Sequence, residues 1–583
     1  MKQFLFFLLI FNLTFLSAMS KKSSIDEVDD WEYNATSVME EHSKSMLRQP
    51  TSASAPIMRS KNIGLSVGGA KDTNNFKANI DNGYLPKLES ITYEGQFYNH
   101  YFDTGVGTGE CKSLFCPSYS SAKRLNQFSD EEEYFLSVGL NSGIKEDDFK
   151  RKKLNLVVVL DISGSMRSKF NAYHYDKVGN KVSHNEQEHK TKMAIANESI
   201  VTMLSHLKDD DKVGIALFDH NAYKAKPLRL VGKTDKIAIR NHILELKPRG
   251  GTNWSAGYKE GLKLFDEVEL SSEYENRIVF LTDAMPNRGE LKKNKLFGMA
   301  KKASKRGINT TFIGIGVDFN NDLVEYVSRT KGANYFSVHS SKEFSKLLDK
   351  EFEYMVTPLV YDLELKLSSS AYTIEAVYGS PESNLATGQI MKVNTLFPSH
   401  NDGKATKGGV ILLKLKKNKY ASNNNFELDV SYTNVEGKTF SNKQDVSFKN
   451  KNAYYDNTGI RKAVLVSDYV SVMKNWLIDS RAACNDKVRW VNEQPIEIQK
   501  RCMIYPPMHP DFPRISTWER RSCKLNVSNG YQKLFQVFKK SFENEMNSLN
   551  DDSLNKELEI LNTLLKAKTY FNMGPVDDWQ FKN

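Results

Sequence analysis

The middle of the chain alternates between short apolar runs and stretches with helical spacing. The runs typical of buried strands, all between residues 154 and 338, are LNLVVVL, KVGIALF, NRIVFLT, NTTFIGIGV and NYFSV. A helical face follows the first run, with apolar residues at every third or fourth position: Met193, Ala196, Ile200, Met203 and Leu207. Strands that alternate with helices are typical of a parallel sheet covered on both faces. We therefore predict an α/β domain with a doubly wound, mostly parallel sheet over residues 151–355.

Beyond Pro358 the pattern changes to an alternation of period two. The segments VYDLELKL, GVILLKLKK and NFELDVSYT place apolar and polar residues alternately and are separated by Asn, Gly and Ser turns. This pattern predicts a flanking antiparallel β domain over residues 356–450. Helical spacing returns afterwards at Ala463, Val466, Val470, Met473 and Leu477 and again from about residue 530 to 571. Residues 451–583 are thus expected to be a helical, cysteine-containing region.

The N-terminus, MKQFLFFLLIFNLTFLSAMS, combines a lysine, an apolar stretch and small residues. It predicts a secretory signal peptide over residues 1–20. Residues 21–60 are polar and Ser-rich, which favours a flexible leader, and residues 61–150 form an N-terminal flanking region. No later window of roughly 18 apolar residues or C-terminal lipid-anchor signal is present. We expect a secreted, multidomain protein without a membrane anchor.

Charge gives little indication of a nucleic-acid partner. The chain has 81 basic and 71 acidic residues, a net charge of +10, and the two signs are interspersed. No basic block with interleaved aromatic residues tracks a phosphate backbone. We therefore expect no nucleic-acid binding.

Five cysteines lie outside the α/β segment: Cys111, Cys116, Cys484, Cys502 and Cys523. In an oxidising compartment, disulfides are favoured over a zinc site, which would require tighter paired spacings. The odd number leaves one cysteine unpaired or pairing between chains. Cys111 and Cys116 are close enough in sequence to pair locally, but the spacing does not fix the connectivity.

Hard oxygen ligands occur in three loops that a parallel sheet brings to one edge. Asp161 ends the first strand, and Ser163 and Ser165 follow it two residues apart. The loops RGGTNWS and FLTDAMPN carry Thr252 and Asp283. Ligands bind at the carboxyl ends of strands in such sheets, and these oxygens suit a six-coordinate Mg²⁺, or Mn²⁺ or Ca²⁺. The alternative is a cluster of turns and caps that holds no metal.

The motifs DISGSM, GGTN and LTDAMPN, in this order, resemble the metal-ion-dependent adhesion site of von Willebrand factor A domains. The resemblance implies that the metal ligands, some through water, are Asp161, Ser163, Ser165, Thr252 and Asp283. Ala284 stands where the family usually has glycine. The flanks, including AVLVSDYVSVMKNWLIDSR, are similar to those of extracytoplasmic von Willebrand factor A proteins, some of them lipoproteins. No lipobox cysteine follows the signal peptide here.

These features predict a secreted, non-enzymatic binding or adhesion protein whose metal coordinates an exposed Asp or Glu of a protein partner. One alternative is a structural or matrix scaffold with a merely stabilising metal. A remote alternative is a serine hydrolase, because GLSVG around Ser66 matches a nucleophile elbow, although no clear helix follows it and no partner histidine is placed. Three histidines in the polar segment after Met166 are expected to be solvated: His174, His184 and His189.

Partner selection is expected at a long polar segment that leaves the metal site after Met166. It exceeds the typical connection of roughly 4 to 6 residues. The side chains expected at this rim are Arg167, Lys169, Phe170, Tyr173 and Tyr175. A disordered surface insertion is an equal alternative.

Five glycosylation sequons occur along the chain, at Asn34, Asn197, Asn253, Asn309 and Asn526. Asn253 directly follows Thr252, so a glycan there would block a protein partner. We expect Asn253 to be unmodified.

Overall fold

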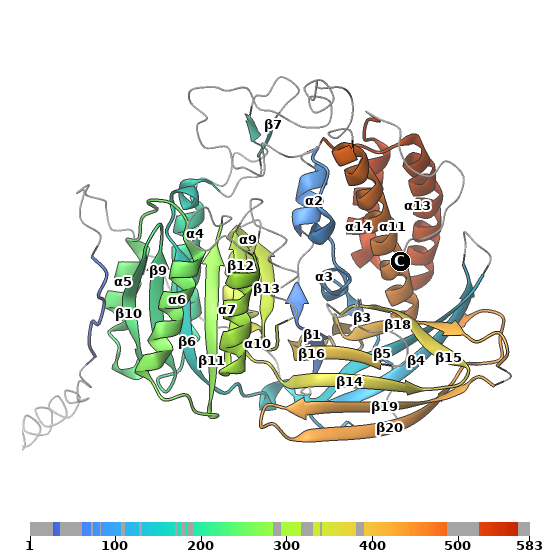
Figure 1. Cartoon of the computed structure of the whole chain (residues 1–583), viewed down its shortest axis with the longest axis horizontal. Coiled ribbons are helices and arrows are strands. Elements are labelled where there is room, and N and C mark those ends of the chain that lie inside the picture. The colour runs from blue at the N-terminus through green and yellow to red at the C-terminus, as the bar shows by residue number, and fades with distance from the viewer. Residues whose placement is uncertain are drawn as a thin grey trace, which may run out of the picture.

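The computed structural model shows two large sheets with separate helical layers (Figure 1). One sheet has seven strands and is mostly parallel, whereas the other has ten strands and is antiparallel. The predicted fold class is confirmed. The structure describes residues 27–34, 61–70, 74–81, 83–105, 111–126, 131–169, 173–175, 181–183, 190–283, 293–315, 330–338, 341–380, 390–421, 423–486 and 524–569.

The seven-stranded sheet forms the centre of the α/β domain. Its order is β10 (Ala222–Leu230), β9 (Lys212–Phe218), β6 (Lys153–Asp161), β11 (Tyr274–Thr282), β12 (Ile308–Ile315), β13 (Asn334–Val338) and β2 (Gly69–Ala70). All neighbouring pairs are parallel except β10 with β9. The five apolar runs of the sequence become β6, β9, β11, β12 and β13.

Both faces of this sheet are covered by helices because successive strand residues point to opposite sides. The covering helices are α4 (Lys192–Ser205), α5 (Lys236–Leu244), α6 (Trp254–Leu264), α7 (Lys293–Lys305) and α9 (Ser341–Leu348). Leu156 and Val158 of β6 share a core with α4, α5 and α9. Val157 and Val159 share another with α6 and α7. β6 is therefore buried on both faces, and its carboxyl end is held in a fixed position.

The antiparallel sheet, here called the β domain, is built from segments on both sides of the α/β domain. Its strands are β1 (Asn62–Val67), β4 (Cys116–Leu125), β5 (Glu132–Lys145), β14 (Val360–Ser368), β15 (Tyr372–Tyr378), β16 (Ile390–Ser399), β18 (Val410–Lys417), β19 (Asn425–Asn434), β20 (Thr439–Ser447) and β21 (Tyr454–Tyr455). β1 lies between β5 and β16. Residues 356–450 alone do not form this domain, which corrects the predicted boundary: the α/β domain is inserted into it.

The helical region packs on one face of the β domain's sheet, against β4, β5 and β18 (Figure 1). It comprises α11 (Thr458–Asp486), α13 (Asn529–Leu549) and α14 (Asn555–Leu565), joined by α2 (Asn74–Asp81) and α3 (Tyr93–Tyr98). Trp476 of α11 and Phe535 of α13 are fully buried in this core. In the described part of the chain, no helix is both long and apolar enough to cross a membrane.

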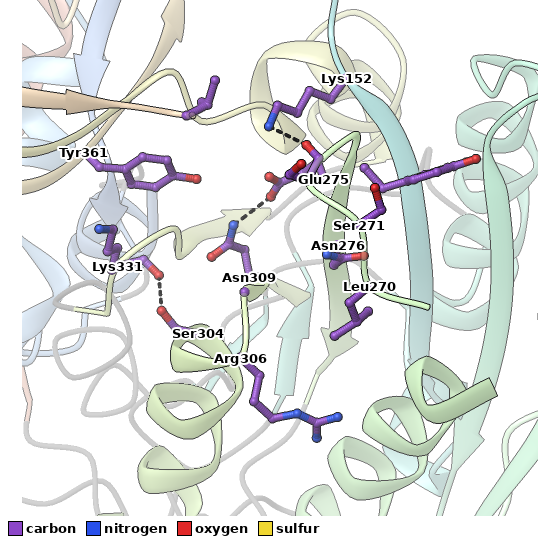
Figure 2. Close-up of a pocket in the computed structure, with 14 residues that line it drawn as sticks. Lys152, Leu270, Ser271, Glu275, Asn276, Ser304, Arg306, Asn309, Lys331 and Tyr361 are labelled. Carbon is purple, nitrogen blue, oxygen red and sulfur yellow. Dashed lines mark hydrogen bonds between the residues drawn. The ribbon is translucent and has the colours of Figure 1, made fainter. Parts of the chain in front are cut away.

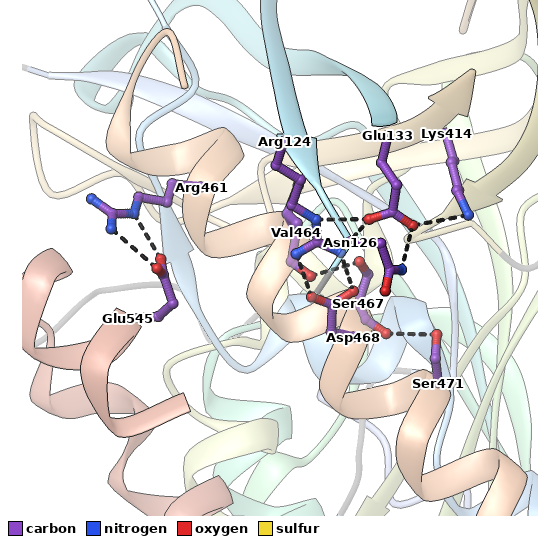
Figure 3. A network of polar contacts seen from close by, with 10 residues as sticks. All are labelled: Arg124, Asn126, Glu133, Lys414, Arg461, Val464, Ser467, Asp468, Ser471 and Glu545. Carbon is purple, nitrogen blue, oxygen red and sulfur yellow. Dashed lines mark hydrogen bonds and ion pairs between the residues drawn. The ribbon is translucent and has the colours of Figure 1, made fainter. Parts of the chain in front are cut away.

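A network of polar contacts fastens α11 to the β domain (Figure 3). Arg124 of β4 donates two hydrogen bonds to Asp468 of α11, at 2.6 and 2.9 Å. Its Nε also donates to Glu133 of β5 at 2.8 Å, and Lys414 of β18 pairs with the same carboxylate at 3.1 Å. A bidentate arginine fixes orientation as well as distance. The helix is thus held in one register on the sheet.

An acidic N-terminal segment, residues 27–34, lies along the edge of the α/β domain. Asp30 contacts the fully buried ammonium group of Lys226 at 3.1 Å. Trp31 stacks on His242 with ring centroids 5.2 Å apart, and Tyr33 packs edge-on against Tyr223. These residues fall within the predicted flexible leader. For them that prediction does not hold, because ion pairs and aromatic contacts dock them on β10 and α5.

Replacing Asp30 with Ala should lower the free energy of unfolding by about 2–4 kcal/mol, because it leaves the buried Lys226 without its carboxylate. Urea unfolding of the full chain measures this change. Glu32→Gln is the matched control: its contact with Lys224 is partly exposed and should cost under about 1 kcal/mol. Equal costs for the two variants would mean that the segment is only loosely attached.

Candidate metal site

The candidate site is built at the carboxyl end of β6, where Asp161 is fully buried. Its Oδ1 accepts a hydrogen bond from the backbone N–H of Ser163 at 2.7 Å. Its Oδ2 accepts one from the Thr282 hydroxyl, on the neighbouring strand β11, at 2.5 Å. Both carboxylate oxygens therefore have fixed positions between two loops.

Three further oxygens form a chain beside this carboxylate. The hydroxyl oxygens of Ser163 and Ser165 are 2.9 Å apart, and the Ser165 hydroxyl donates to Oδ1 of Asp283 at 2.7 Å. Ligands at right angles around Mg²⁺, each about 2.0–2.1 Å from the ion, lie ~3 Å apart. The two observed separations are close to this spacing. Since Ser165 is exposed and Asp283 is buried, the cluster opens to solvent on the serine side.

The loop that carries Thr252 is fastened to the Asp161 loop through the backbone. Arg249 N–H donates to the Ile162 carbonyl at 2.6 Å, and Gly164 N–H donates to the Gly250 carbonyl at 3.0 Å. Gly250 has a φ of +68°, and a Cβ there would lie 2.6 Å from Nδ1 of His220. Glycine is needed at this position. Thr252 itself is buried at the same sheet edge, directly before the helix α6.

The site's electrostatics favour a bound cation. Burial and the neighbouring Asp283 carboxylate raise the pKa of Asp161 to about 7. A divalent ion between the two carboxylates would remove this repulsion. Two carboxylates and several hydroxyls are also the ligand chemistry that Mg²⁺ and Mn²⁺ prefer. The residues present therefore fit a hard divalent cation.

Sequence reasoning did not single out Lys192, the first residue of α4. Its Nζ donates to Oδ2 of Asp283 at 3.1 Å, and its side chain is only 5% exposed. Arg249 and Asp219 were also missed: Arg249 Nε donates to the buried Asp219 carboxylate at 3.0 Å. A signal was available for Lys192, because it interrupts the apolar face of a helix that begins near the metal loops.

A family model for the von Willebrand factor type A domain matches residues 156–286. These residues include all five candidate ligands. The α/β domain is a von Willebrand factor A (VWA) domain.

Curated relatives share this domain. Inter-alpha-trypsin inhibitor heavy chain H2 of Mus musculus is 23% identical over 224 residues, 38% of this chain and 21% of that protein. The uncharacterized protein YfbK of Escherichia coli is 22% identical over 218 residues, 36% of this chain and 33% of that protein. The chain thus spans about a fifth to a third of the length of these relatives.

Solved structures include similar chains at low sequence identity. A von Willebrand factor type A protein from Catenulispora acidiphila aligns with a TM-score of 0.41 and 11% identity over 74% of this chain and 96% of that one. Proximal thread matrix protein 1 from the mussel byssus is described with a zinc-occupied metal-ion-dependent adhesion site (MIDAS) motif. It aligns with a TM-score of 0.27 and 17% identity over 35% of this chain and 46% of that one.

The predicted partner rim of the VWA domain lies partly within the structure. Arg167 is exposed and donates to the Pro248 carbonyl at 3.0 Å, and Lys169 pairs through its backbone with Thr191. Tyr173 and Tyr175 lie in a short hairpin, β7 (Tyr173–Tyr175) with β8 (Lys181–Ser183), of which the backbone is described. The predicted rim residue Phe170, the histidines His184 and His189, and Ala284 lie outside the described residues.

A pocket of about 340 Å³ opens at the opposite end of the VWA sheet, toward the β domain (Figure 2). Its basic side chains already have partners: Lys152 donates to the Ser272 carbonyl, Arg306 to Asp266, and Lys331 to Asp362. Asn309 donates to Glu275 inside it. The pocket therefore belongs to the contact between domains and lies apart from the candidate metal site.

The other predicted sites have the following positions. Cys111 and Cys116 form a disulfide, Cys484 lies in α11, and Cys502 and Cys523 lie outside the described residues.

Among the sequons, Asn197, Asn309 and Asn526 are buried, whereas Asn34 is exposed. Asn253 caps α6 by accepting a hydrogen bond from Ala256 N–H. Within the described residues, no group of three or more His, Cys, Asp or Glu side chains could hold a metal, so a metal at the candidate site would need hydroxyl ligands as well.

Proposed function

We propose that this chain is a secreted binding protein whose VWA domain holds a divalent cation, and that the cation coordinates an acidic side chain of a protein partner. The observation that carries the proposal is the oxygen cluster of Ser163, Ser165 and Asp283, with neighbouring oxygens 2.9 and 2.7 Å apart. Mg²⁺ is the first candidate and Mn²⁺ or Ca²⁺ the alternatives. The open side of the cluster leaves room for a ligand from outside.

Five residues of this chain would hold the ion, directly or through water: Asp161, Ser163, Ser165, Thr252 and Asp283. The two carboxylates neutralise its charge, and the hydroxyls keep it electrophilic toward an incoming carboxylate. Relatives named as inter-alpha-trypsin inhibitor heavy chains share the domain, which supports a role in protein binding. No step of this proposal requires catalysis.

The hydrolase alternative is disfavoured by the surroundings of Ser66. This residue is 1% exposed and lies in the interior strand β1, where it pairs with Phe397. A nucleophile at a strand-to-helix turn needs an exposed hydroxyl. A scaffold role with a stabilising metal remains the competing proposal, and it differs in one respect: partner binding would not need the cation.

Cation-dependent capture separates these two proposals. The immobilised full chain, incubated with extracellular proteins, should retain partners in Mg²⁺ and release them in EDTA. Ser165→Ala should lose this capture, because it removes the exposed ligand. Ser205→Ala, at an exposed serine that ends α4 and donates to the Thr202 carbonyl, is the matched control and should behave as the unaltered chain. Capture that is equal in Mg²⁺ and EDTA would favour the scaffold role.

We further propose that the segment following the site selects the partner. Replacing Ser168 to Glu188 with a short Gly/Ser linker should leave Mg²⁺ affinity within about threefold and weaken partner binding at least about tenfold, since aromatic and basic anchors dominate many interfaces. Calorimetry and capture at fixed salt measure the two effects. A Gly/Ser replacement of residues 435–437, in the turn between β19 and β20, controls for loop exchange. Unchanged partner affinity would place selectivity elsewhere, with the β domain as the next region to test.

A further inference from the structure

Lys192 occupies a position that is costly for a lysine. It is the first residue of α4, where the helix dipole disfavours a positive charge, and the whole residue is only 4% exposed. Lysine is almost never fully buried unless it is paired. Here its Nζ lies 3.1 Å from Oδ2 of Asp283, a buried carboxylate. Two separate costs at one residue indicate a role beyond helix formation.

The Asp283 carboxylate faces two ways. Its Oδ1 accepts from the Ser165 hydroxyl, on the side of the candidate ligands, while its Oδ2 accepts from Lys192. Lys192 therefore leaves the metal-facing oxygen available and fixes the direction in which it points. An outer partner of this kind orients a ligand without binding the ion.

The contact between Lys192 and Asp283 changes the total charge around a bound cation. A divalent cation is neutralised by the carboxylates of Asp161 and Asp283, and the ammonium group of Lys192 adds one positive charge. With the cation bound, these four groups together carry one net positive charge. An incoming carboxylate cancels this charge, whereas a neutral ligand does not.

We infer that the charge of Lys192 makes the VWA site select anionic ligands, at the expense of cation affinity. The ammonium group repels the divalent ion and attracts the partner's carboxylate. Charges a few ångströms apart at a partly buried site interact strongly enough to change either affinity severalfold. The inference rests on the proposed function, because it presupposes that the site binds a cation.

Removing the charge should therefore change the two affinities in opposite directions. In Lys192→Gln, Mn²⁺ affinity should rise at least about fivefold, while acetate binding to the Mn²⁺-loaded protein should weaken at least about fivefold. Mn²⁺ serves as the probe because its effect on water proton relaxation reports both events: binding of the ion, and loss of a bound water when acetate enters. Acetamide, the neutral analogue, should show no dependence on Lys192.

Two variants separate charge from structure. Lys192→Arg keeps the charge and should retain both affinities within about threefold. Lys190→Gln removes a charge two residues away, where Lys190 pairs with Glu198 on the surface, and should change neither. A merely structural role for Lys192 would weaken both affinities together and lower thermal stability in the Gln and Arg variants alike.

The possible failures are distinguishable. If the unaltered chain binds no Mn²⁺ or Mg²⁺, both the proposed function and this inference are overturned. If it binds the ion but Lys192→Gln leaves cation and acetate affinities unchanged, or lowers both, only this inference is overturned.

Discussion

Replacing Asp161 with Asn should reduce the Mg²⁺ affinity of the full chain at least about 100-fold, because it removes one of two carboxylates that face the candidate site. The same substitution should make the cation-free protein more stable at pH 8. Cation affinity falls while the stability of the cation-free protein rises, because the Asp161 carboxylate attracts a bound cation but is buried beside another carboxylate when no cation is present. A substitution of a merely structural residue would lower stability.

The expected gain in stability follows from the pKa of Asp161, which burial and the Asp283 carboxylate raise from 3.8 to about 7. The folded state therefore holds this proton to a higher pH than the unfolded state does. That contribution to stability is fully present below pH 3.8 and is lost as pH rises through about 7. Asn is neutral throughout, and its amide can donate to the Thr282 hydroxyl. We expect a gain on the order of 2 kcal/mol at pH 8.

Calorimetric titration with Mg²⁺ and thermal unfolding in EDTA at pH 5 and pH 8 test both effects. Asp266→Asn is the matched control, since Asp266 is exposed and pairs only at the surface with Arg306. It should change neither quantity. An Asp161→Asn variant that binds Mg²⁺ within threefold of the unaltered chain, or that is less stable at pH 8, would contradict the assignment.

The α/β domain and its ligand loops could be predicted from sequence because their signals are local. The run LNLVVVL is long, apolar and β-branched, and it ends directly at Asp161, so strand and ligand are read from one segment. The loop with Asp283 follows the run NRIVFLT in the same way, and a parallel sheet brings the carboxyl ends of such strands to one edge. Thr252 instead lies between the helices α5 and α6, so its place at this edge could be expected only from the GGTN motif.

The insertion of this domain into the β domain could not be predicted in the same way. β5 (Glu132–Lys145) does alternate, with Leu136, Val138 and Leu140 separated by small or polar residues, but this pattern predicts only a strand and not the strands that pair with it. Its pairing with β18 joins residues more than 250 positions apart, such as Val410 with Gly139. Pairing over such separations depends on tertiary contacts, which leave no periodic trace in the sequence.

Lys192 and the N-terminal segment show a second limit. Charged residues such as Lys192 and Asp30 usually indicate solvent exposure. Here each side chain is buried beside an opposite charge distant in sequence: Lys192 pairs with Asp283, and Asp30 pairs with Lys226. Composition records the charge and not the partner. A buried ion pair can therefore be recognised only when the structure places its two members together.

Replacing Asp211 with Ala should lower the free energy of unfolding by about 3–5 kcal/mol, which is a large share of the stability of a typical domain. Asp211 and Arg151 are 0% and 1% exposed, and two hydrogen bonds of 2.9 and 2.6 Å join them. The same carboxylate also accepts from the backbone N–H of Leu154 at 2.8 Å. Its loss leaves the buried guanidinium near the start of β6 with the longer contact to the partly exposed Glu353, at 3.5 Å, as its counter-charge.

The neighbouring residue provides the control. Asp210 contacts Lys153 at 3.7 Å with both side chains about half exposed, so Asp210→Ala should cost under about 1 kcal/mol. Urea unfolding of both variants, followed by circular dichroism, measures the difference. In Arg151→Met/Asp211→Leu the charges are removed together, and the cost should be smaller than for Asp211→Ala alone.

Cation affinity distinguishes the two ends of β6. Asp211, which lies directly before β9, contacts the beginning of β6 at Leu154, whereas Asp161 ends β6, and the segment between these two points is fully buried. Asp211→Ala should therefore destabilise the domain while leaving the Mg²⁺ affinity of the folded fraction within about threefold, whereas Asp161→Asn should do the reverse. Both variants are compared under conditions where each is fully folded. Loss of cation affinity in both would mean that a change at the beginning of β6 disturbs the candidate metal site at its carboxyl end.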